Sequence, residues 1–217
     1  MRALCDEVAG PAVGLLVNNA GLAHYMPFTK LRSDHAEELV RLNVLAPVLL
    51  THAVVGGMRD RANGAIINYA SLLAFSGSVD APTLPARAVY AGTRAFIVTF
   101  TQALATELQD TGLRVQVVCP GIVRTEFHER QGIDMSAVPR MEPDDVVTAS
   151  LLDLESGVVV CIPGLGDPGA WERHEALERE LMGWTRIRDL PDRYRRVDVD
   201  RVGTRSYGGE EPARHRP

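Results

Sequence analysis

Four short runs of apolar residues recur along the chain, and each has the length of a β-strand. Apolar side chains stand next to one another in these runs instead of alternating with polar ones. That pattern is typical of strands covered on both faces, as in parallel sheets. Each run ends at asparagine, serine or proline. The predicted strands cover residues 13–17, 65–70, 113–119 and 158–162.

Longer segments with apolar residues at helical spacing lie between these runs. The predicted helices cover residues 2–9, 35–60, 86–111, 142–156 and 169–184. Strands that alternate with helices indicate an α/β domain with a parallel sheet. In such sheets, ligands bind beyond the carboxyl ends of the strands.

Polar and turn-forming residues gather at those strand ends. Asn18-Asn19-Ala20-Gly21 follows the first strand, Ser71 follows the second, and Pro120–Thr125 follows the third. Tyr90 begins the helix that comes after Ser71. Because parallel strands end at one edge of the sheet, we expect these segments to converge there.

Asn43 and Pro47 interrupt the helix predicted over residues 35–60. Proline has no N–H, so it cannot donate to the carbonyl of Asn43, four residues earlier. We expect a bend there, with that carbonyl left for a water or a ligand. A proline kink that is merely tolerated explains the same residues.

Tyr90 and Arg94 are four residues apart, which on a helix puts both side chains on one face. A cation held close to a phenol lowers its pKa from about 10 by roughly 1–3 units. A phenol tuned in this way can exchange a proton with a hydroxyl or carbonyl oxygen. The alternative is a surface helix with an ordinary tyrosine and arginine.

Composition and charge narrow the classes of function. The net charge of −5 over 217 residues gives no basic field for nucleic acid or an anionic membrane. No uninterrupted apolar run reaches the roughly 18 residues of a membrane span, and no signal-peptide pattern opens the chain, so we expect a cytoplasmic protein. The 3 cysteines form no Cys-x-x-Cys pair and the 6 histidines no ligand spacing, so we predict no metal site.

The last 32 residues differ in character from the rest. Residues 186–217 carry nine arginines, six acids and few apolar side chains. We expect a polar, Arg-rich tail after a domain over residues 1–185. A nucleic-acid arm is the alternative, although the interleaved acids argue against it.

Taken together, these motifs resemble the short-chain dehydrogenase/reductase family. Asn18–Gly21 is similar to the family's motif after its fourth strand, and Asn43, Ser71 and Tyr90 match its catalytic asparagine, serine and tyrosine. Pro120–Thr125 matches its motif at the nicotinamide end of the cofactor. Residues 119–128 further resemble the bacterial branch labelled DltE-like. The resemblance covers about residues 1–166.

The resemblance implies a Rossmann-like, doubly wound parallel sheet and an NAD(P)-dependent oxidoreductase that acts on a secondary alcohol or ketone. It implies a homo-oligomer and leaves NAD and NADP open. The implied catalytic residues are Tyr90, Ser71, Asn43 and Arg94. The implied cofactor-binding residues are Asn18, Ala20, Gly21, Tyr90, Arg94, Pro120, Gly121, Val123 and Thr125. The implied apolar pocket is lined by Phe75, Pro82, Leu84, Phe127 and Met141.

The sequence departs from the family in two respects. Arg94 stands where the family has lysine, and 22 of the 23 basic residues of this chain are arginine. No Gly-rich turn for the pyrophosphate precedes the strand at residue 13, and a βαβ unit needs about 30 residues. We therefore expect an N-terminally truncated fold whose sheet ends at that strand. The alternative is that the chain pairs this edge with something else. The alternative function is a non-catalytic relative that serves as a binding or oligomerisation module.

Overall fold

A computed structural model describes residues 2–9, 13–191 and 194 of the chain. The chain divides into two compact units, residues 1–165 and residues 166–217. The sequence led us to expect a domain that ends at residue 185, so the observed boundary lies about 20 residues earlier. The predicted strands and the candidate site all belong to the first unit.

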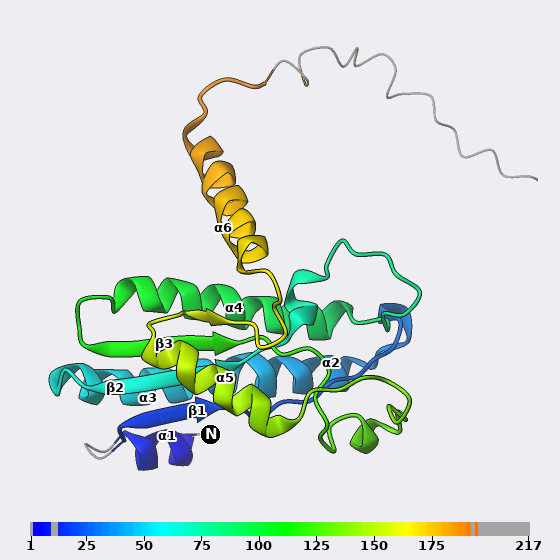
Figure 1. Cartoon of the computed structure of the whole chain (residues 1–217), viewed down its shortest axis with the longest axis horizontal. Coiled ribbons are helices and arrows are strands. Elements are labelled where there is room, and N and C mark those ends of the chain that lie inside the picture. The colour runs from blue at the N-terminus through cyan, green and yellow to red at the C-terminus, as the bar shows by residue number, and fades with distance from the viewer. Residues whose placement is uncertain (1, 10–12, 192–193, 195–217) are drawn as a thin grey trace, which may run out of the picture. The chain divides into compact units, whose positions relative to one another are not determined.

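The first unit is built on a parallel sheet of four strands (Figure 1). The strands are β1 (Leu15–Asn18), β2 (Gly64–Tyr69), β3 (Leu113–Val118) and β4 (Val160–Cys161), and they lie in that order. Val17 pairs with Ile67, and Ile67 pairs with Gln116. The predicted parallel α/β sheet is confirmed, and all four predicted strands are present, the last one shorter than expected.

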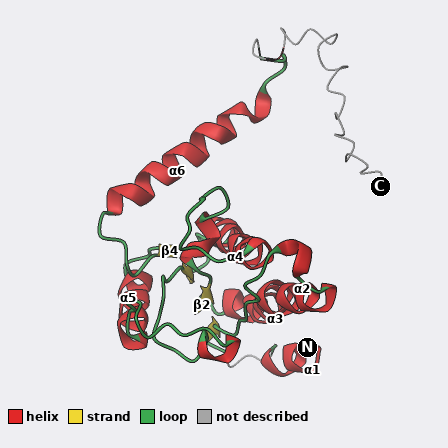
Figure 2. Cartoon of the chain, turned by 90° about the vertical axis from the view of Figure 1, so that its right-hand side faces the viewer, coloured by secondary structure: helices red, strands yellow, loops and turns green. Residues whose placement is uncertain are grey.

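Helices cover both faces of the sheet (Figure 2). The helices α1 (Arg2–Val8), α2 (Ser33–Val40), α3 (Ala46–Asp60) and α4 (Ala88–Glu107) lie on one side, and α5 (Pro143–Glu155) lies on the other. Successive side chains of a strand point to opposite faces, so one strand supplies two cores. Ile66 packs with Val54 and Met58 on the α3 side, whereas Ile67 packs with Val146 on the α5 side. This is the doubly wound arrangement expected from the sequence.

The segment Ser33–Asp60 is one run of helix with a wide turn in it. Residues Arg41–Leu45 form a π-helical turn, in which the Ala46 N–H donates to the Arg41 carbonyl five residues earlier. Pro47 follows in the first turn of α3, where its missing N–H costs little. The predicted irregularity at Asn43 is therefore present, and it takes the form of an extra residue in the turn. Such π turns occur often at functional sites.

The same segment is long and apolar enough, by length and composition alone, to cross a membrane. This qualifies the expectation that no segment would meet that criterion. One such helix is weak support for a membrane span, because a core helix of a soluble protein meets the criterion too. Leu39, Val54 and Met58 of this segment are buried in the first unit.

Two glycines with positive φ follow helices, Gly112 after α4 and Gly157 after α5. Gly112, between α4 and β3, has φ +78°, and a Cβ there would clash with the Ala62 carbonyl oxygen. Gly157, with φ +77°, follows α5 as the sequence predicted. At its start, α5 has Pro143 in the first turn with two aspartates, and their charge favours the positive end of the helix dipole.

The strand β1 forms one edge of the sheet. Among the described residues, no strand pairs with its outer side. Leu15 and Val17, on the face toward α5, remain 51% and 45% exposed. The expectation that the sheet ends at this strand is therefore met within the described part of the chain.

The second unit contains the helix α6 (Pro168–Gly183). The Asp167 side chain caps its first turn by accepting from the Gly169 N–H at 3.0 Å. This agrees with the predicted helix over residues 169–184. Most of the predicted Arg-rich tail, residues 192–193 and 195–217, lies outside the described residues.

Candidate active site

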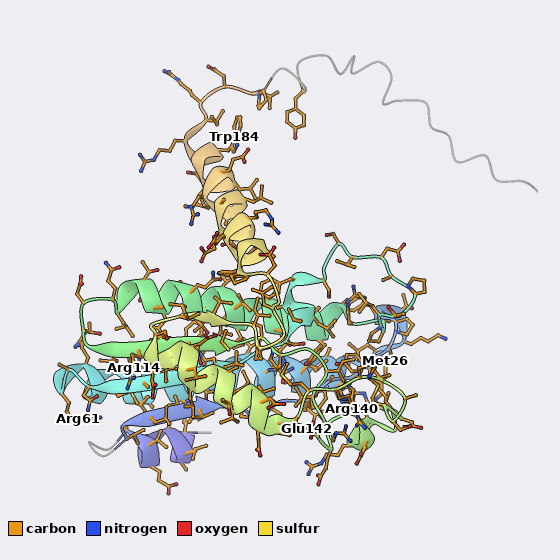
Figure 3. All side chains as sticks on the ribbon, in the orientation of Figure 1. Met26, Arg61, Arg114, Arg140, Glu142 and Trp184 are labelled. Atoms are coloured by element: carbon orange, nitrogen blue, oxygen red, sulfur yellow. The ribbon has the colours of Figure 1, made fainter. Side chains whose placement is uncertain are left out.

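A cavity of about 850 Å³ lies at the carboxyl ends of β1, β2 and β3. Met26, Arg140 and Glu142 mark this end of the sheet, and Arg61 marks the opposite end (Figure 3). The cavity walls come from the strand ends, the loop before α4, the segment after β3 and the start of α5. Among the residues that line it are Gly21, Tyr25, Ser71, Leu73, Leu84, Tyr90, Arg94, Pro120, Gly121, Val123, Thr125, Phe127, His128 and Met135.

Tyr90 occupies the first turn of α4 and faces this cavity. Its side chain is only 5% exposed. Its ring makes an edge contact with Tyr25, with centroids 5.3 Å apart and planes at 72°, and lies 6.3 Å from the ring of Phe127. Neighbouring rings thus hold Tyr90 in place from two sides.

Arg94 lies one helical turn after Tyr90 and is also 5% exposed. Its guanidinium carbon lies 5.1 Å from the centroid of the Tyr90 ring. Nη1 donates to the carbonyl of Tyr69, at the end of β2, at 3.0 Å. Nε is buried with no hydrogen-bond partner, and no acid pairs with Arg94 among the described residues. The result is a buried positive charge against the phenol, with no carboxylate to neutralise it.

Gly21 makes room for that guanidinium. A Cβ at this position would clash with Nη2 of Arg94. The loop after β1 therefore passes directly against the cation, and a larger residue here would force the guanidinium to move.

Ser71 follows β2 and lines the same cavity as Tyr90. Its Oγ accepts from the Leu73 N–H at 3.2 Å and so caps the short 3-10 turn Leu72–Phe75. The Leu72 N–H donates to the Pro120 carbonyl at 3.0 Å, which ties this turn to the segment after β3. The structure thus brings Ser71, Tyr90 and Arg94 to one cavity.

Asn43 lies beneath the site and does not line the cavity. Its fully buried amide donates to the Leu22 carbonyl at 2.9 Å and accepts from the Leu22 N–H at 3.1 Å. It also donates to Thr93 Oγ1 at 3.2 Å, and Thr93 Oγ1 donates to the Tyr90 carbonyl at 2.7 Å. Asn43 therefore fixes the loop after β1 to the first turn of α4.

Asn18 likewise acts inside the fold. Its amide donates to Asn68 Oδ1 at 2.8 Å, and Asn68 Nδ2 donates to Thr101 Oγ1 at 2.9 Å. These bonds join β1, β2 and α4 through buried polar side chains. Neither Asn18 nor Ala20 lines the cavity, whereas Gly21, Pro120, Gly121, Val123 and Thr125 do.

Of the five residues expected to form an apolar pocket, Pro82, Leu84 and Phe127 line the cavity, and Phe75 and Met141 do not. Met141 instead pairs with Val123 through an isolated parallel bridge, which joins the two ends of the loop between them.

Arg87 is a residue of this region that the sequence did not single out. It precedes α4 and donates to the Ser76 hydroxyl at 2.7 Å, to the Ser76 carbonyl at 2.7 Å and to the Val79 carbonyl at 2.8 Å. It also donates to the Pro85 carbonyl at 3.1 Å. Arg87 thus ties together both arms of the loop that forms one wall of the cavity.

Burial and neighbouring groups shift several ionisable groups around the site. Burial raises the pKa of Tyr25, and the nearby Tyr90 phenol raises it further, while Arg94 opposes the shift. Burial also raises the pKa of Cys119 to about 12, again against the effect of Arg94. Burial and Arg140 lower the pKa of His128. The apolar surroundings thus keep these side chains neutral.

Tyr25 is the functional candidate that sequence reasoning missed. It lies four residues beyond Gly21, in a loop with no motif of its own, and its ring also stacks near His128, with centroids 6.5 Å apart. Among the described residues, no group of three or more His, Cys, Asp or Glu could hold a metal ion.

Comparison with known proteins places this chain in a family. A family model described as short chain dehydrogenase matches residues 2–135. The chain is 31% identical to a short-chain dehydrogenase from Sphingobium yanoikuyae solved in complex with NADPH, with a TM-score of 0.82 over 89% of this chain and 74% of that one. A bulky-bulky ketone specific alcohol dehydrogenase from Comamonas testosteroni gives 28% identity and a TM-score of 0.75 over the same shares.

Curated relatives match over a shorter span. The inactive 2-(S)-hydroxypropyl-CoM dehydrogenase 2 of Xanthobacter autotrophicus is 32% identical over 63% of this chain. A very-long-chain 3-oxoacyl-CoA reductase of Laccaria bicolor is 40% identical over 53% of it. The matched segments span 56% and 33% of the lengths of these two relatives. No finding separates out the DltE-like branch. With its α/β fold, its site at the strand ends and these matches, the chain belongs to the short-chain dehydrogenase family.

Proposed function

We propose that this chain carries the catalytic part of an NAD(P)-dependent oxidoreductase that interconverts a secondary alcohol and a ketone. The observation that carries the proposal is the convergence of Tyr90, Ser71 and Arg94 on one largely apolar cavity at the carboxyl ends of three parallel strands. A proton-exchanging phenol, a hydroxyl donor and a fixed cation are what acid–base chemistry on a carbonyl oxygen needs.

Each of the three side chains has a distinct part in this proposal. In alcohol oxidation, Tyr90 takes the proton of the substrate hydroxyl, and in ketone reduction it returns a proton to the carbonyl oxygen. Ser71 donates a hydrogen bond to that oxygen and orients it. Arg94, over the Tyr90 ring, favours the ionised phenol.

The cofactor we propose is NAD or NADP, bound with its nicotinamide end at this cavity. When bound, the nicotinamide accepts or donates the hydride. Gly21, Pro120, Gly121 and Thr125 line the cavity together and would contact such a group. The NADPH complex of the Sphingobium relative supports this proposal. Asn18 and Asn43 would act indirectly, by holding the strand end and the loop after β1.

The lining of the cavity favours a bulky, uncharged substrate. Among the described residues that line the cavity, Arg94 and His128 are basic and none is acidic. The wall away from the strands is built of aliphatic and aromatic side chains, among them Leu72, Leu73, Leu84, Phe127, Ile133 and Met135. The ketone specificity stated for the Comamonas relative points in the same direction.

We also propose a cytoplasmic homo-oligomer. Leu45 and Leu49 near the start of α3 and Phe96 on α4 are 36–45% exposed and give these helices an apolar outer surface. Light scattering on the purified chain measures its mass directly, and a monomer at micromolar concentration would refute this part.

The test of the proposed reaction is Tyr90→Phe, assayed with NADH and NADPH against a panel of bulky ketones. Positioned acid–base catalysis contributes typically 10²–10⁴-fold, so we expect a loss of that size. Tyr69→Phe is the matched control, because Tyr69 is another phenol of the cavity wall and has no proposed part in the reaction. Equal turnover by Tyr90→Phe and the unchanged protein would refute the assignment.

The second candidate function is a module that binds without catalysing. It is favoured by Arg94, which stands where the family has lysine and is engaged with the Tyr69 carbonyl. Titration with NADH and NADPH by fluorescence separates the outcomes. Binding without turnover of any ketone by the unchanged protein would select this second function.

A further inference from the structure

Tyr25 is a phenol at the reacting end of the cavity to which the proposed reaction assigns no part. It lies in the loop between β1 and α2 and lines the cavity together with Tyr90. The two rings meet edge to face, with centroids 5.3 Å apart and planes at 72°. Ala23 and Leu39 pack with Tyr90 in the same buried cluster, with Tyr25 against it, so the contact has apolar surroundings.

The titratable and charged groups around Tyr25 are Tyr90 and Arg94 on α4, and His128 in the segment after β3. Arg94 reaches the face of the Tyr90 ring and donates to a backbone carbonyl, so its described bonds do not include the Tyr90 oxygen. The His128 ring is nearly parallel to the Tyr25 ring, with the two centroids 6.5 Å apart. A side-chain hydrogen bond with Tyr90 is among the causes that raise the pKa of Tyr25, so this phenol can donate to a charge on Tyr90.

We propose that Tyr25 is a positioning residue that donates its hydroxyl hydrogen bond to the Tyr90 oxygen when Tyr90 is ionised. The inference rests on the proposed function, because only a proton-exchanging Tyr90 needs such a donor. Tyr25 stays protonated throughout. The proton that Tyr90 takes from the substrate hydroxyl resides on Tyr90, and no bond of Tyr25 is broken.

The electrostatics of the pair agree with this division of labour. Burial and the Tyr90 phenol both raise the pKa of Tyr25, so the Tyr25 hydroxyl keeps its proton and can donate it in a hydrogen bond. A hydrogen bond to a charged group inside an apolar cavity is stronger than one between neutral groups. The hydrogen bond from Tyr25 would thus stabilise the negative charge at the Tyr90 oxygen itself. Arg94 lies over the face of the Tyr90 ring and makes no described hydrogen bond to that oxygen.

The test is a titration of the five tyrosines by NMR of protein labelled with ¹³C at the phenol carbon, with resonances assigned from single Tyr→Phe variants. It needs neither cofactor nor turnover. In Tyr25→Phe we expect the midpoint of the Tyr90 titration to move up by about 1–2 pH units, which is the size of one hydrogen bond to a charged group. In Tyr90→Phe we expect the Tyr25 midpoint to move down, because linkage between two sites is reciprocal.

Tyr69→Phe is the control, since Tyr69 also lines the cavity and no described ring contact joins it to Tyr90. It should move neither midpoint. Both replacements keep the ring, and circular dichroism checks the fold; should Tyr25→Phe fail to fold, the Tyr25 midpoint in Tyr90→Phe decides alone. Phenols that titrate at the same pH with and without each other would overturn the proposal.

Activity provides a second measurement that separates this proposal from the proposed function. If the reaction is as proposed, Tyr25→Phe should shift the acidic limb of the kcat/KM profile for alcohol oxidation to higher pH while KM changes little. Full activity in Tyr90→Phe would refute the function itself. An unshifted profile in an otherwise active Tyr25→Phe would refute only the role of Tyr25.

Discussion

The guanidinium carbon of Arg94 lies 5.1 Å from the centroid of the Tyr90 ring, so the cation lies over the face of the phenol. A cation over an aromatic face is attracted to the ring, and more strongly once the ring carries a negative charge. Arginine in this place can therefore favour the ionised phenol without a hydrogen bond to its oxygen. It does so at the expense of a buried Nε that has no partner.

Replacing Arg94 separates charge from shape. Arg94→Met removes the cation but keeps a long side chain, and we expect kcat/KM for alcohol oxidation to fall by about tenfold or more, because a cation beside a phenol lowers its pKa by roughly 1–3 units. Arg94→Lys keeps a cation and removes the unpartnered Nε, and we expect activity to rise. Steady-state kinetics at several pH values measure both. Lower activity in Arg94→Lys would mean that the site has adapted to arginine.

Gly21→Ala should destabilise the fold through Arg94. The added methyl group would clash with the guanidinium, and overpacking a filled site costs about 1–3 kcal/mol. Urea denaturation measures the free energy of unfolding. Gly92→Ala in α4 is the matched control, because a Cβ there meets nothing within 4 Å, and it should stabilise by about 0.5–1 kcal/mol. Adding Arg94→Met to Gly21→Ala should restore most of the loss.

Asn43→Ala should destabilise the protein by about 2–3 kcal/mol. The substitution leaves the partly buried N–H and carbonyl of Leu22 without their partner, and polar groups left unsatisfied inside a protein cost about 1–3 kcal/mol each. Asn63→Ala, at an exposed turn, is the control and should change stability by less than about 0.5 kcal/mol. Equal unfolding free energies for the two variants would remove the structural role assigned to Asn43.

Arg87→Met should loosen the loop at residues 76–85. The four hydrogen bonds of Arg87 join both arms of that loop, and methionine makes none of them. We expect thermolysin to cut this loop faster in the native protein, and KM for bulky ketones to rise more than kcat falls. Arg41→Met removes an exposed ion pair instead and is the control. An unchanged cleavage rate in Arg87→Met would contradict the assigned role.

The buried thiols should make stability fall at alkaline pH. Burial raises the pKa of Cys119 to about 12, whereas an unfolded thiol ionises near about 8.5. The native state then holds a proton that the unfolded state releases, so the free energy of unfolding decreases as pH rises above about 8.5. Urea titrations of the protein and of Cys119→Ala between pH 7 and pH 10 should show a smaller slope for the variant. Equal slopes of unfolding free energy against pH for the two proteins would contradict the raised pKa of Cys119.

Much of this fold follows from local patterns in the sequence. The strands were visible because their residues are apolar on both faces, and α5 because proline and acids open it and Gly157 follows it. The strand ends then placed Ser71, Tyr90 and Gly21 near one another. These inferences depend on the chain's own periodicity and on the geometry of parallel sheets.

The remaining features depend on contacts between distant segments. Nothing near Tyr25 in the sequence marks it, because its importance comes from the ring of Tyr90, 65 positions later. Arg87 looks like any arginine in an Arg-rich chain until the loop folds back onto it. The proline rule predicted a disturbance near Asn43 but not a π turn, because that choice is set by packing around a fully buried amide.

The bridge between Asn18 and Asn68 has a consequence for the spacing of the whole site. These amides face each other in register on neighbouring strands and bond at 2.8 Å. A slip of one residue of β1 against β2 would turn Asn18 to the opposite face and break its bond to Asn68. It would also displace the glycine after β1 from the serine after β2 by about 3.3 Å, the rise of one strand residue. The buried amides of Asn18 and Asn68 thus help to fix the register of β1 and β2, and with it the relative positions of Gly21 and Ser71.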